Sequence, residues 1–349
     1  MNEFSRKLID WYKKNHRDLP WRSTKDPYII WVSEIILQQT RVAQGYDYFL
    51  RFVSRFPDVK SLAEADEDDV LKLWQGLGYY SRARNLHQAA KQIKGSFPDT
   101  YEEVRALKGV GDYTAAAVCS ISFDLPYAVV DGNVYRVLSR WLGLDLPIDS
   151  TVGKKEFARA AFELLDRSRP GLHNQAIMEF GALQCVPSSP DCNSCPLSGS
   201  CAARRDGLIG QLPVKQHRTS TTDRYFNYIY VRMGAYTFIN RREGNDIWMN
   251  LFELPLIEAS RKITEEELLA HPTFQLLSGG SGESVLKRVR QNVKHVLSHQ
   301  IIHTDLYEIT IPEKADTPLT LPYLKIRADE IGNYAMPKLV VNLIENIRQ

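Results

Sequence analysis

Two carboxylates of this 349-residue chain, Glu34 and Asp131, occupy positions where their chemistry could be used. Glu34 interrupts the apolar stretch 27–41, and burial there would raise its pKa and keep it protonated near neutral pH, as a general acid requires. Asp131 precedes a helical pattern, so it can cap that helix, stay ionised and face a developing cation. One neutral and one charged carboxyl form the pairing that breaks glycosidic bonds. The alternatives are a solvated Glu34 and an Asp131 that only caps its helix.

Four of the five cysteines fall in one short segment with the spacing C-x6-C-x2-C-x5-C. Prolines keep this segment from forming a helix, so four thiolates can converge on one centre. Clustered cysteines in a reducing compartment are more often metal ligands than disulfides, and both zinc and an iron–sulfur cluster accept four thiolates. Cys119, the fifth, lies in an apolar pattern and is expected in the core. The predicted ligands are Cys185, Cys192, Cys195 and Cys201.

A tight turn with two glycines, Gly109 and Gly111, separates two apolar helical patterns in the stretch LKGVGDYT. The turn lacks the third glycine of G-x-G-x-x-G and has no Gly-Lys-Ser/Thr, so it does not support dinucleotide or P-loop binding. Glycines would instead let backbone N–H groups approach a phosphate beside a helix N-terminus, whose dipole favours an anion. An ordinary turn is the alternative.

The elements that would position these groups change in type near residue 184. Before that point apolar residues recur with the helical period, which predicts an all-helical region. Thr100 and Glu103 form a capping box that starts one further helix. The predicted helices are 2–14, 27–41, 66–75, 80–94, 112–122, 133–142, 151–166 and 173–184.

The C-terminal part has a different pattern of residue types. Aromatic and β-branched residues around Gly234 predict a hairpin, and mixed strands and helices follow, which indicates an α+β domain. We expect a helical region at 1–202, a polar linker at 203–222 and a second domain at 223–349. Within that domain the predicted strands are 248–256, 296–303 and 305–311, and the predicted helices are 263–270, 284–292 and 337–348.

Composition sets limits on the function. The net charge of +2 gives no strong basic field, so any nucleic-acid binding must come from local patches and backbone amides. No apolar run approaches the roughly 18 residues of a membrane span, and the N-terminus has an amphipathic pattern rather than that of a targeting peptide. We expect a cytoplasmic monomer, nucleoid-associated, or nuclear if the source has a nucleus.

Taken together, the glycine turn, the stretch VVDGNV around Asp131 and the cysteine run resemble the helix–hairpin–helix DNA glycosylases. Further motifs are similar to those of the adenine DNA glycosylases of the MutY type: LPWR (19–22), WVSEIILQQT (31–40), GLGYYSRARNL (76–86) and KHVLSH (294–299). The resemblance covers nearly the whole chain. It implies a helical core (a six-helix barrel with the helix–hairpin–helix), a 4Fe–4S cluster on the four cysteines and a MutT-like, or Nudix-like, C-terminal domain.

The resemblance also implies an activity and its residues. The substrate would be double-stranded DNA with adenine opposite 8-oxoguanine or guanine. Glu34 matches the general acid, Asp131 the carboxylate that stabilises or traps the sugar cation, and Asn133 a supporting polar group. Tyr113 stands where related lyases carry a Lys that forms a Schiff base, which implies hydrolysis without strand cleavage. Residues matching substrate or DNA contacts are Arg22, Gln39, Thr40, Leu77, Tyr79, Arg82, Gly109, Val110, Gly111, Gln175, Ser298 and His299.

The sequence departs from the family pattern at two places, and two alternative functions fit some of its motifs. Leu297 replaces the Phe of a Phe-Ser-His turn, which weakens any role for an aromatic wedge there. The second domain lacks an Arg-Glu-x-x-Glu-Glu pattern, which argues against pyrophosphohydrolase activity. The first rival is an endonuclease III-type glycosylase and lyase acting on oxidised pyrimidines. The second is a metal-stabilised DNA-binding module without catalysis.

Overall fold

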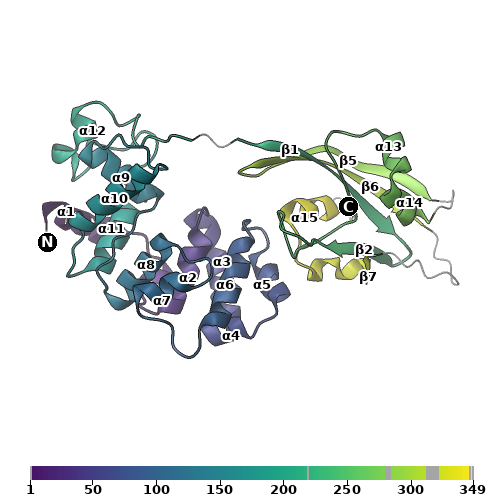
Figure 1. Ribbon diagram of the computed structural model, residues 1–349, viewed down its shortest axis with the longest axis horizontal. Helices are drawn as coiled ribbons and strands as arrows, with labels where there is room; N and C mark the ends of the chain where they lie inside the picture. Colours follow the sequence, from purple (N-terminus) through teal and green to yellow (C-terminus); the bar gives the residue numbers. More distant parts are fainter. Residues whose placement is uncertain (1, 218–219, 280–283, 312–321, 346, 348–349) are drawn as a thin grey trace. The chain divides into compact units, whose positions relative to one another are not determined.

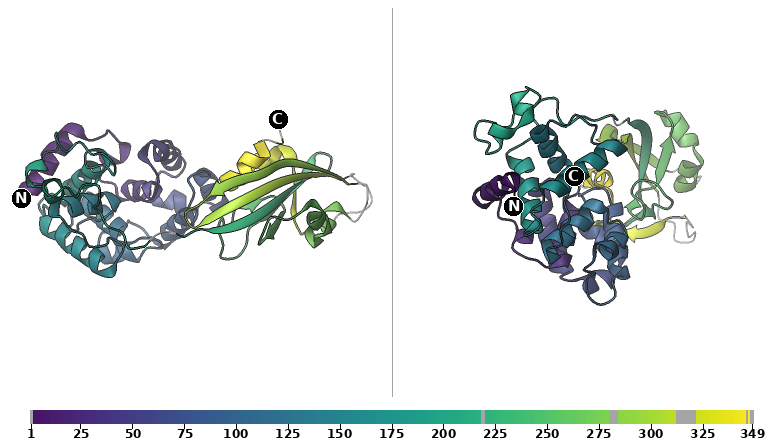
Figure 2. Two further views of the ribbon diagram at one scale, coloured as in Figure 1. Left: turned by 90° about the horizontal axis from the view of Figure 1, so that it is seen from above. Right: turned by 60° about the vertical axis from the view of Figure 1, so that its left-hand side comes forward.

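A computed structural model describes residues 2–217, 220–279, 284–311, 322–345 and 347, which form two compact units (Figure 1; Figure 2). The first unit comprises residues 1–64 and 85–218, and the second comprises 65–84 and 219–349. Among the described residues no helix is both long and apolar enough to cross a lipid bilayer.

The first unit is helical. Its central helix α11 (Pro170–Leu183) packs on α1 (Glu3–Asn15), α8 (Asp112–Phe123) and α9 (Gly132–Leu142). The remaining elements are η1 (Pro20–Arg22), α2 (Pro27–Leu37), α3 (Val42–Arg55), α4 (Val59–Ala63), the end of α6 (Ser81–Gln92), α7 (Tyr101–Ala106), α10 (Thr151–Leu164), η2 (Ser198–Ser200) and α12 (Ala202–Arg205). The predicted capping contact at the start of α7 is present, because the Thr100 side chain accepts a hydrogen bond from the backbone N–H of Glu103.

Helices α7 and α8 form a hairpin around the two-glycine turn. Helix α8 begins after Gly111 and contains the small residues Ala115–Ala117, all buried, which let it pack closely on α2 and α11. Gly109 adopts φ +76°, and a Cβ there would lie 2.6 Å from the Cβ of Asn85. Only glycine therefore fits this turn without strain.

The second unit contains two sheets. Strands β4 (Leu256–Ala259), β1 (Thr222–Arg232), β6 (Gln300–Thr310) and β5 (Val285–Val296) form one sheet in that order, in which only the β1–β6 pair is parallel. Strands β3 (Phe252–Glu253), β2 (Tyr236–Arg241) and β7 (Leu324–Arg327) form the other.

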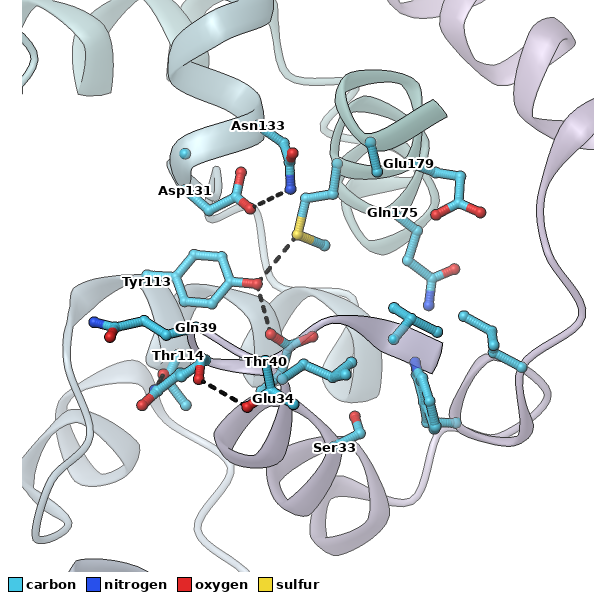
Figure 3. Close-up of a pocket in the computed structure, with 18 of the residues that line it drawn as sticks. Ser33, Glu34, Gln39, Thr40, Tyr113, Thr114, Asp131, Asn133, Gln175 and Glu179 are labelled. Atoms are coloured by element: carbon cyan, nitrogen blue, oxygen red, sulfur yellow. Dashed lines mark hydrogen bonds between the residues drawn. The ribbon is translucent and has the colours of Figure 1, made fainter. Parts of the chain in front are cut away.

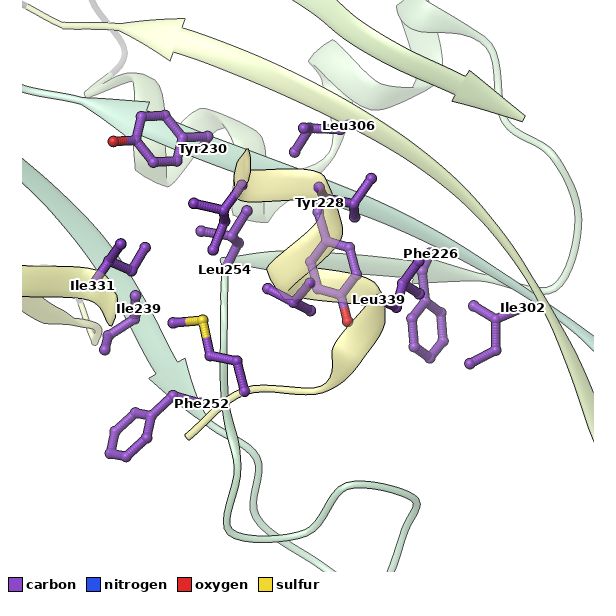
Figure 4. Close-up of a cluster of buried hydrophobic side chains, with 14 of the residues drawn as sticks. Phe226, Tyr228, Tyr230, Ile239, Phe252, Leu254, Ile302, Leu306, Ile331 and Leu339 are labelled. Carbon is purple, nitrogen blue, oxygen red and sulfur yellow. The ribbon is translucent and has the colours of Figure 1, made fainter. Parts of the chain in front are cut away.

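Helices cover both faces of the larger sheet. Phe226, Tyr228 and Tyr230 of β1 join α15 (Lys338–Glu345) in one buried cluster (Figure 4). The alternate residues Ile229 and Val231 pack with α13 (Glu265–Ala270) and α14 (Pro272–Ser278) on the opposite face. β1 is thus apolar on both faces, as a central strand requires.

Residues 65–84, which include α5 (Glu67–Trp74), belong to the second unit, although the sequence pattern predicts them as part of the helical region. Lys72 Nζ donates to the carbonyl oxygens of Gly332 and Tyr334 at the end of η3 (Ala328–Asn333). Gln75 Oε1 accepts from the backbone N–H of Met336 at 3.1 Å. The limits 1–202, 203–222 and 223–349 stay predictions, and residues 218–219 of the linker lie outside the described residues.

Two predicted elements are wrong. The segment 248–256, expected as one strand, contains only β3 and the first residue of β4, because Trp248 and Asn250 adopt the left-handed φ of a turn. The segment 284–292, expected as a helix, lies in β5, which pairs antiparallel with β6 from Val285 to Val296. Register shifts occur between Arg288 and Arg290 and between Arg290 and Val293. These bulges disturb the strict alternation of a strand, which explains why the sequence pattern could be taken for a helical one.

Candidate active site

The first unit contains a pocket of about 1070 Å³ that gathers the predicted catalytic residues. Its walls come from η1, α2, the residues after α2, the start of α8, the segment before α9, and α11. Glu34, Tyr113, Asp131 and Asn133 all line it (Figure 3). Residues far apart in the chain therefore meet here, as the sequence analysis expects.

Glu34 is held at the pocket floor by helix α2. The helix starts with Pro27 after the N-cap Asp26, whose side chain accepts from the N–H of Tyr28. Ile30 and Trp31 are buried, whereas the Glu34 carboxyl faces the pocket. The Tyr113 hydroxyl lies 2.6 Å from Glu34 Oε2, to which it donates, and 3.2 Å from the sulfur of Met178.

The surroundings of Glu34 change its acidity. Burial raises the pKa of Glu34 from its ordinary value to about 7, and the negative charge of Asp131 adds to this rise. The hydrogen bond from Tyr113 and the positive charge of Arg22 act in the opposite direction. A carboxyl that titrates near neutral pH is suited to donate a proton at the pH where cells operate.

Asp131 caps helix α9 and lies across the pocket from Glu34. Its Oδ1 accepts from the backbone N–H of Val134 at 2.8 Å, and its Oδ2 accepts from Asn133 Nδ2 at 2.8 Å. Burial raises the pKa of Asp131, and these two hydrogen bonds oppose that rise by favouring the anion. The carboxylate is thus fixed in direction and faces the same space as Glu34 (Figure 3).

Helix α11 holds the Asp131 segment in place. Asn174 donates to the carbonyl oxygen of Tyr127 and accepts from the N–H of Val129, so it fixes the extended chain that leads to Asp131. Farther along the same helix, a Cβ on Gly181 would lie 2.6 Å from the Cβ of Asn133. The start of α9 can approach α11 only because Gly181 has no side chain.

We predict that Gly181→Ala destabilises the protein, because the added methyl forces α9 away from α11 at a cost of about 1–3 kcal/mol. The gain of roughly 1 kcal/mol that alanine normally brings to a helix interior offsets part of this cost. Urea denaturation measures the difference. Gly210→Ala is the control, since a Cβ at Gly210 meets nothing within 4 Å. Equal stability of the two variants would contradict the prediction.

Several other predicted contact residues line the same pocket, namely Arg22, Gln39, Thr40, Gly109, Gly111 and Gln175. Gln175 projects toward the space above Glu34, and its Oε1 accepts from the Tyr12 hydroxyl at 3.2 Å. Gln39 is exposed and adopts a left-handed φ of 55°. Val110 is buried, so only its backbone is available to a ligand at the hairpin.

The remaining predicted contact residues belong to the second unit. The Tyr79 hydroxyl is hydrogen-bonded to Ser298 Oγ, and Tyr79 is 45% exposed with a left-handed φ of 46°. Leu77 is buried, and the Arg82 guanidinium lies over the rings of Trp74 and Tyr79. Ser298 and His299 are exposed at the turn between β5 and β6, beside a partly buried Leu297.

The four clustered cysteines lie between α11 and α12, and Cys201 directly precedes α12. Among the described residues, no three His, Cys, Asp or Glu side chains are drawn together closely enough to hold one metal ion. The pKa of Cys195 is raised to about 11, mainly by burial, and the charges of Cys185, Cys201 and Cys192 contribute to this rise. Arg140, which is buried, lies with Nη1 3.5 Å from Cys185 Sγ.

Arg136 links the cysteine segment to the Asp131 segment. Its Nε donates to the carbonyl oxygen of Cys185 at 2.7 Å, and its Nη2 donates to Asn133 Oδ1 at 2.8 Å. Asn133 in turn donates to Asp131. A continuous set of hydrogen bonds therefore runs from the cysteine segment to the pocket.

The sequence analysis missed several residues of the site, above all Arg17, Arg136, Met178 and Glu179. Glu179 has the same local signal as Glu34, since it is a carboxylate inside the apolar pattern 173–184. Arg17 has no such signal, because its partner Glu179 lies 162 residues away in the chain.

Comparison with protein families gives two matches. The HhH-GPD superfamily of base excision DNA repair proteins matches residues 32–159, and the NUDIX domain matches residues 227–346. These matches confirm the predicted fold class, a helix–hairpin–helix core followed by a NUDIX-like domain.

Individual relatives agree with the family matches. The adenine DNA glycosylase of Buchnera aphidicola subsp. Acyrthosiphon pisum is 33% identical, covering 88% of this chain and 87% of its own. The adenine DNA glycosylase of Mus musculus is 42% identical, covering 60% of this chain and 43% of its own. Among solved structures, a thermostable thymine-DNA glycosylase is similar with a TM-score of 0.54 and 27% identity, covering 58% of this chain and 95% of its own. An endonuclease III–DNA complex shares the fold, with a TM-score of 0.51 and 20% identity, and the match covers 59% of this chain and 95% of that one.

Proposed function

The chain belongs to the adenine DNA glycosylase family, and from this premise we propose that it removes adenine mispaired with 8-oxoguanine or guanine in double-stranded DNA. The observation that carries the proposal is the pocket in which Glu34, with a pKa raised to about 7, faces the hydrogen-bonded carboxylate of Asp131. Such a pair breaks glycosidic bonds by acid catalysis and cation stabilisation.

In the proposed reaction, Glu34 first protonates a ring nitrogen of the extruded adenine, so that the base leaves as a neutral molecule. The C1′–N9 bond then breaks and its electron pair goes to the base. The sugar is left as an oxocarbenium ion, which the Asp131 carboxylate stabilises or traps. Water adds to C1′ and releases a proton to the solvent, from which Glu34 is protonated again, and an abasic site is left in an uncut strand.

Tyr113 supports hydrolysis rather than strand cleavage. Its phenol is held between Glu34 and Met178, and burial raises the pKa of Tyr113 well above its ordinary value. A neutral phenol cannot form a Schiff base with the sugar as a lysine amine does. We therefore propose a monofunctional glycosylase.

We propose that DNA is held by phosphate contacts at the α7–α8 hairpin, where Gly109 and Gly111 leave backbone N–H groups accessible. Gln39 and Tyr79 would enter the base stack during extrusion. The left-handed φ of both residues supports this role, because such strain in non-glycine residues concentrates at functional sites. Ser298 and His299, exposed at the β5–β6 turn, would contact the base opposite the adenine. A DNA repair enzyme of this kind would work where the genome lies, in the cytoplasm or a nucleus.

We further propose that the four cysteines bind a 4Fe–4S cluster. Both a single zinc ion and a four-iron cluster accept four thiolates, and the cysteine run that resembles that of the helix–hairpin–helix DNA glycosylases favours the cluster. The cationic Arg140 beside Cys185 would compensate thiolate charge. When bound, the cluster supplies a structural crosslink of the segment 185–201 and takes no part in the proton transfers.

If the cluster is present, protein purified without oxygen is expected to show an absorbance band at about 400 nm. Iron–thiolate charge transfer absorbs there, whereas a zinc–thiolate site does not. Cys192→Ala is expected to lose the band and to lower thermal stability. Cys119→Ala, a matched loss of a cysteine outside the cluster segment, should keep the band. Iron analysis of the three proteins gives an independent reading. A colourless protein with stoichiometric zinc would reject the cluster.

Single-turnover cleavage of a labelled duplex with adenine opposite 8-oxoguanine tests the function. Product that appears only after alkali treatment is expected from a monofunctional adenine glycosylase. Strand breaks without alkali, together with borohydride trapping of a covalent complex, would instead indicate a lyase. Cleavage of a thymine-glycol duplex in place of the adenine substrate would favour the endonuclease III-type alternative. Binding without any cleavage would favour a DNA-binding module.

A further inference from the structure

A buried carboxylate in the pocket wall holds two arginines and has no role in the mechanism above. Glu179 of α11 is 1% exposed. Its Oε1 accepts from the backbone N–H and Nε of Arg17, both at 2.9 Å, and from Arg22 Nη1 at 2.8 Å. Its Oε2 accepts from Arg17 Nη2 at 2.6 Å and from Arg22 Nη2. We call Arg17, Arg22 and Glu179 the ion triad.

The ion triad carries a net charge of +1. Burial alone would raise the pKa of Glu179, but the hydrogen bonds from Arg17 and Arg22 outweigh it and lower the pKa to about 2. Glu179 is therefore ionised wherever the enzyme works. Buried ion groups rarely stabilise a fold more than apolar residues of the same size, so a triad in a pocket wall calls for another reason.

The three residues of the triad and the general acid line the same pocket. The positive charge of Arg22 acts on Glu34 and lowers its pKa. The other groups that act on Glu34 in the described part of the chain are Tyr113 from α8 and Asp131 from the start of α9. Among these three residues Arg22 is the one whose position is fixed by a further carboxylate of the described chain, because Arg22 Nη1 and Nη2 both donate to Glu179.

We infer that Glu179 is a positioning residue for base excision: its carboxylate fixes Arg22 in the wall of the pocket that holds the general acid, and it cancels one of the two positive charges that Arg17 and Arg22 bring to this wall. Without that negative charge the wall would carry +2, favouring the ionised form of Glu34 and repelling a protonated adenine. Without Arg17 the wall would be neutral, and Glu34 would hold its proton to higher pH. This inference rests on the proposed function.

The test measures the single-turnover rate of adenine removal against pH, from about pH 5.5 to about pH 9, and takes the pH at which the rate falls to half on the basic side. Glu179→Gln is expected to lower this midpoint and Arg17→Gln to raise it, because the first change makes the pocket wall more positive and the second makes it less positive. The double variant restores a net charge of +1 and should return the midpoint toward that of the wild type.

A purely structural role would give a different pattern, in which both single variants lose rate without opposite shifts and the double variant is the most impaired. That pattern, or unmoved midpoints, would overturn the inference. Asp18→Asn is the control, because it removes one negative charge from an exposed neighbour and should leave the midpoint in place. If Glu179→Gln fails to fold, Arg17→Gln still tests the sign, since the Arg17 side chain is 35% exposed. A wild-type protein that removes no adenine would reject the proposed function itself, whereas an active one with unshifted variants rejects this inference alone.

Discussion

Asp131→Asn is expected to bind a duplex with adenine opposite 8-oxoguanine as tightly as the wild type and to remove the adenine at least about 10²–10³-fold more slowly. Asparagine has the same shape as aspartate, and its Oδ1 can still accept from the N–H of Val134, so helix α9 keeps its cap. What is lost is the negative charge that faces the developing sugar cation, together with the acceptor for Asn133 Nδ2. The main loss therefore falls on the chemical step, and the helix cap keeps the fold and DNA binding.

Single-turnover rates and electrophoretic binding of the two proteins measure this separation. Asp124→Asn is the matched control, because Asp124 is an exposed residue in a left-handed position that asparagine also tolerates. It should excise adenine at the wild-type rate. A similar rate for Asp131→Asn and the wild type would mean that another group stabilises the cation, and Asp131 would then be only a helix cap.

The helical half of this protein could be predicted because its signals are local. The apolar spacing within α2, α8, α9 and α11 depends on residues three or four positions apart, and each of these helices packs its apolar face on a neighbour. Strand β5 shows the opposite case. Its residues 285–296 alternate imperfectly because of bulges, and pairing with β6 decides their conformation.

The residues of the site also divide into those with a local signal in the sequence and those whose role depends on distant partners. Glu34 and Asp131 could be found from their immediate neighbours, one an apolar helix and the other a helix start. The hydrogen bonds that tune them could not be predicted, because Arg22 and Glu179, or Arg136 and Asn133, meet only after the chain has folded. Resemblance to a family supplied contact residues such as Tyr79 and Ser298, whose hydrogen bond no periodicity in the sequence indicates.

The packing of residues 65–84 on the C-terminal part also could not be predicted from the sequence. The helical period over 66–75 correctly indicates α5, but a period says nothing about which unit a helix packs on. The deciding contacts are polar and specific, as where Lys72 reaches the carbonyl oxygens of Gly332 and Tyr334. Residues from two distant stretches of sequence thereby form one compact unit that carries both Tyr79 and Ser298.

Glu34→Gln is expected to slow adenine removal by about 10²–10⁴-fold, the usual range for loss of a general acid. Glutamine keeps the size of the side chain and still accepts a hydrogen bond from the Tyr113 hydroxyl through its amide oxygen, so the pocket should keep its shape. An amide cannot give a proton to a ring nitrogen. Adenine would then have to leave as an anion, which raises the barrier to breaking the C1′–N9 bond.

The pH dependence separates this explanation from a general loss of structure. Because burial raises the pKa of Glu34 to about 7, the protonated, active fraction of the wild type is large below that pH and declines as pH rises through it. The wild-type rate should therefore fall on the basic side with a midpoint near 7, whereas the small residual rate of Glu34→Gln should lack this decline. Glu163→Gln, at an exposed position on α10, is expected to keep both the rate and the profile. A basic decline that persists in Glu34→Gln would assign the titrating group to another residue, and Glu34 would no longer be the general acid.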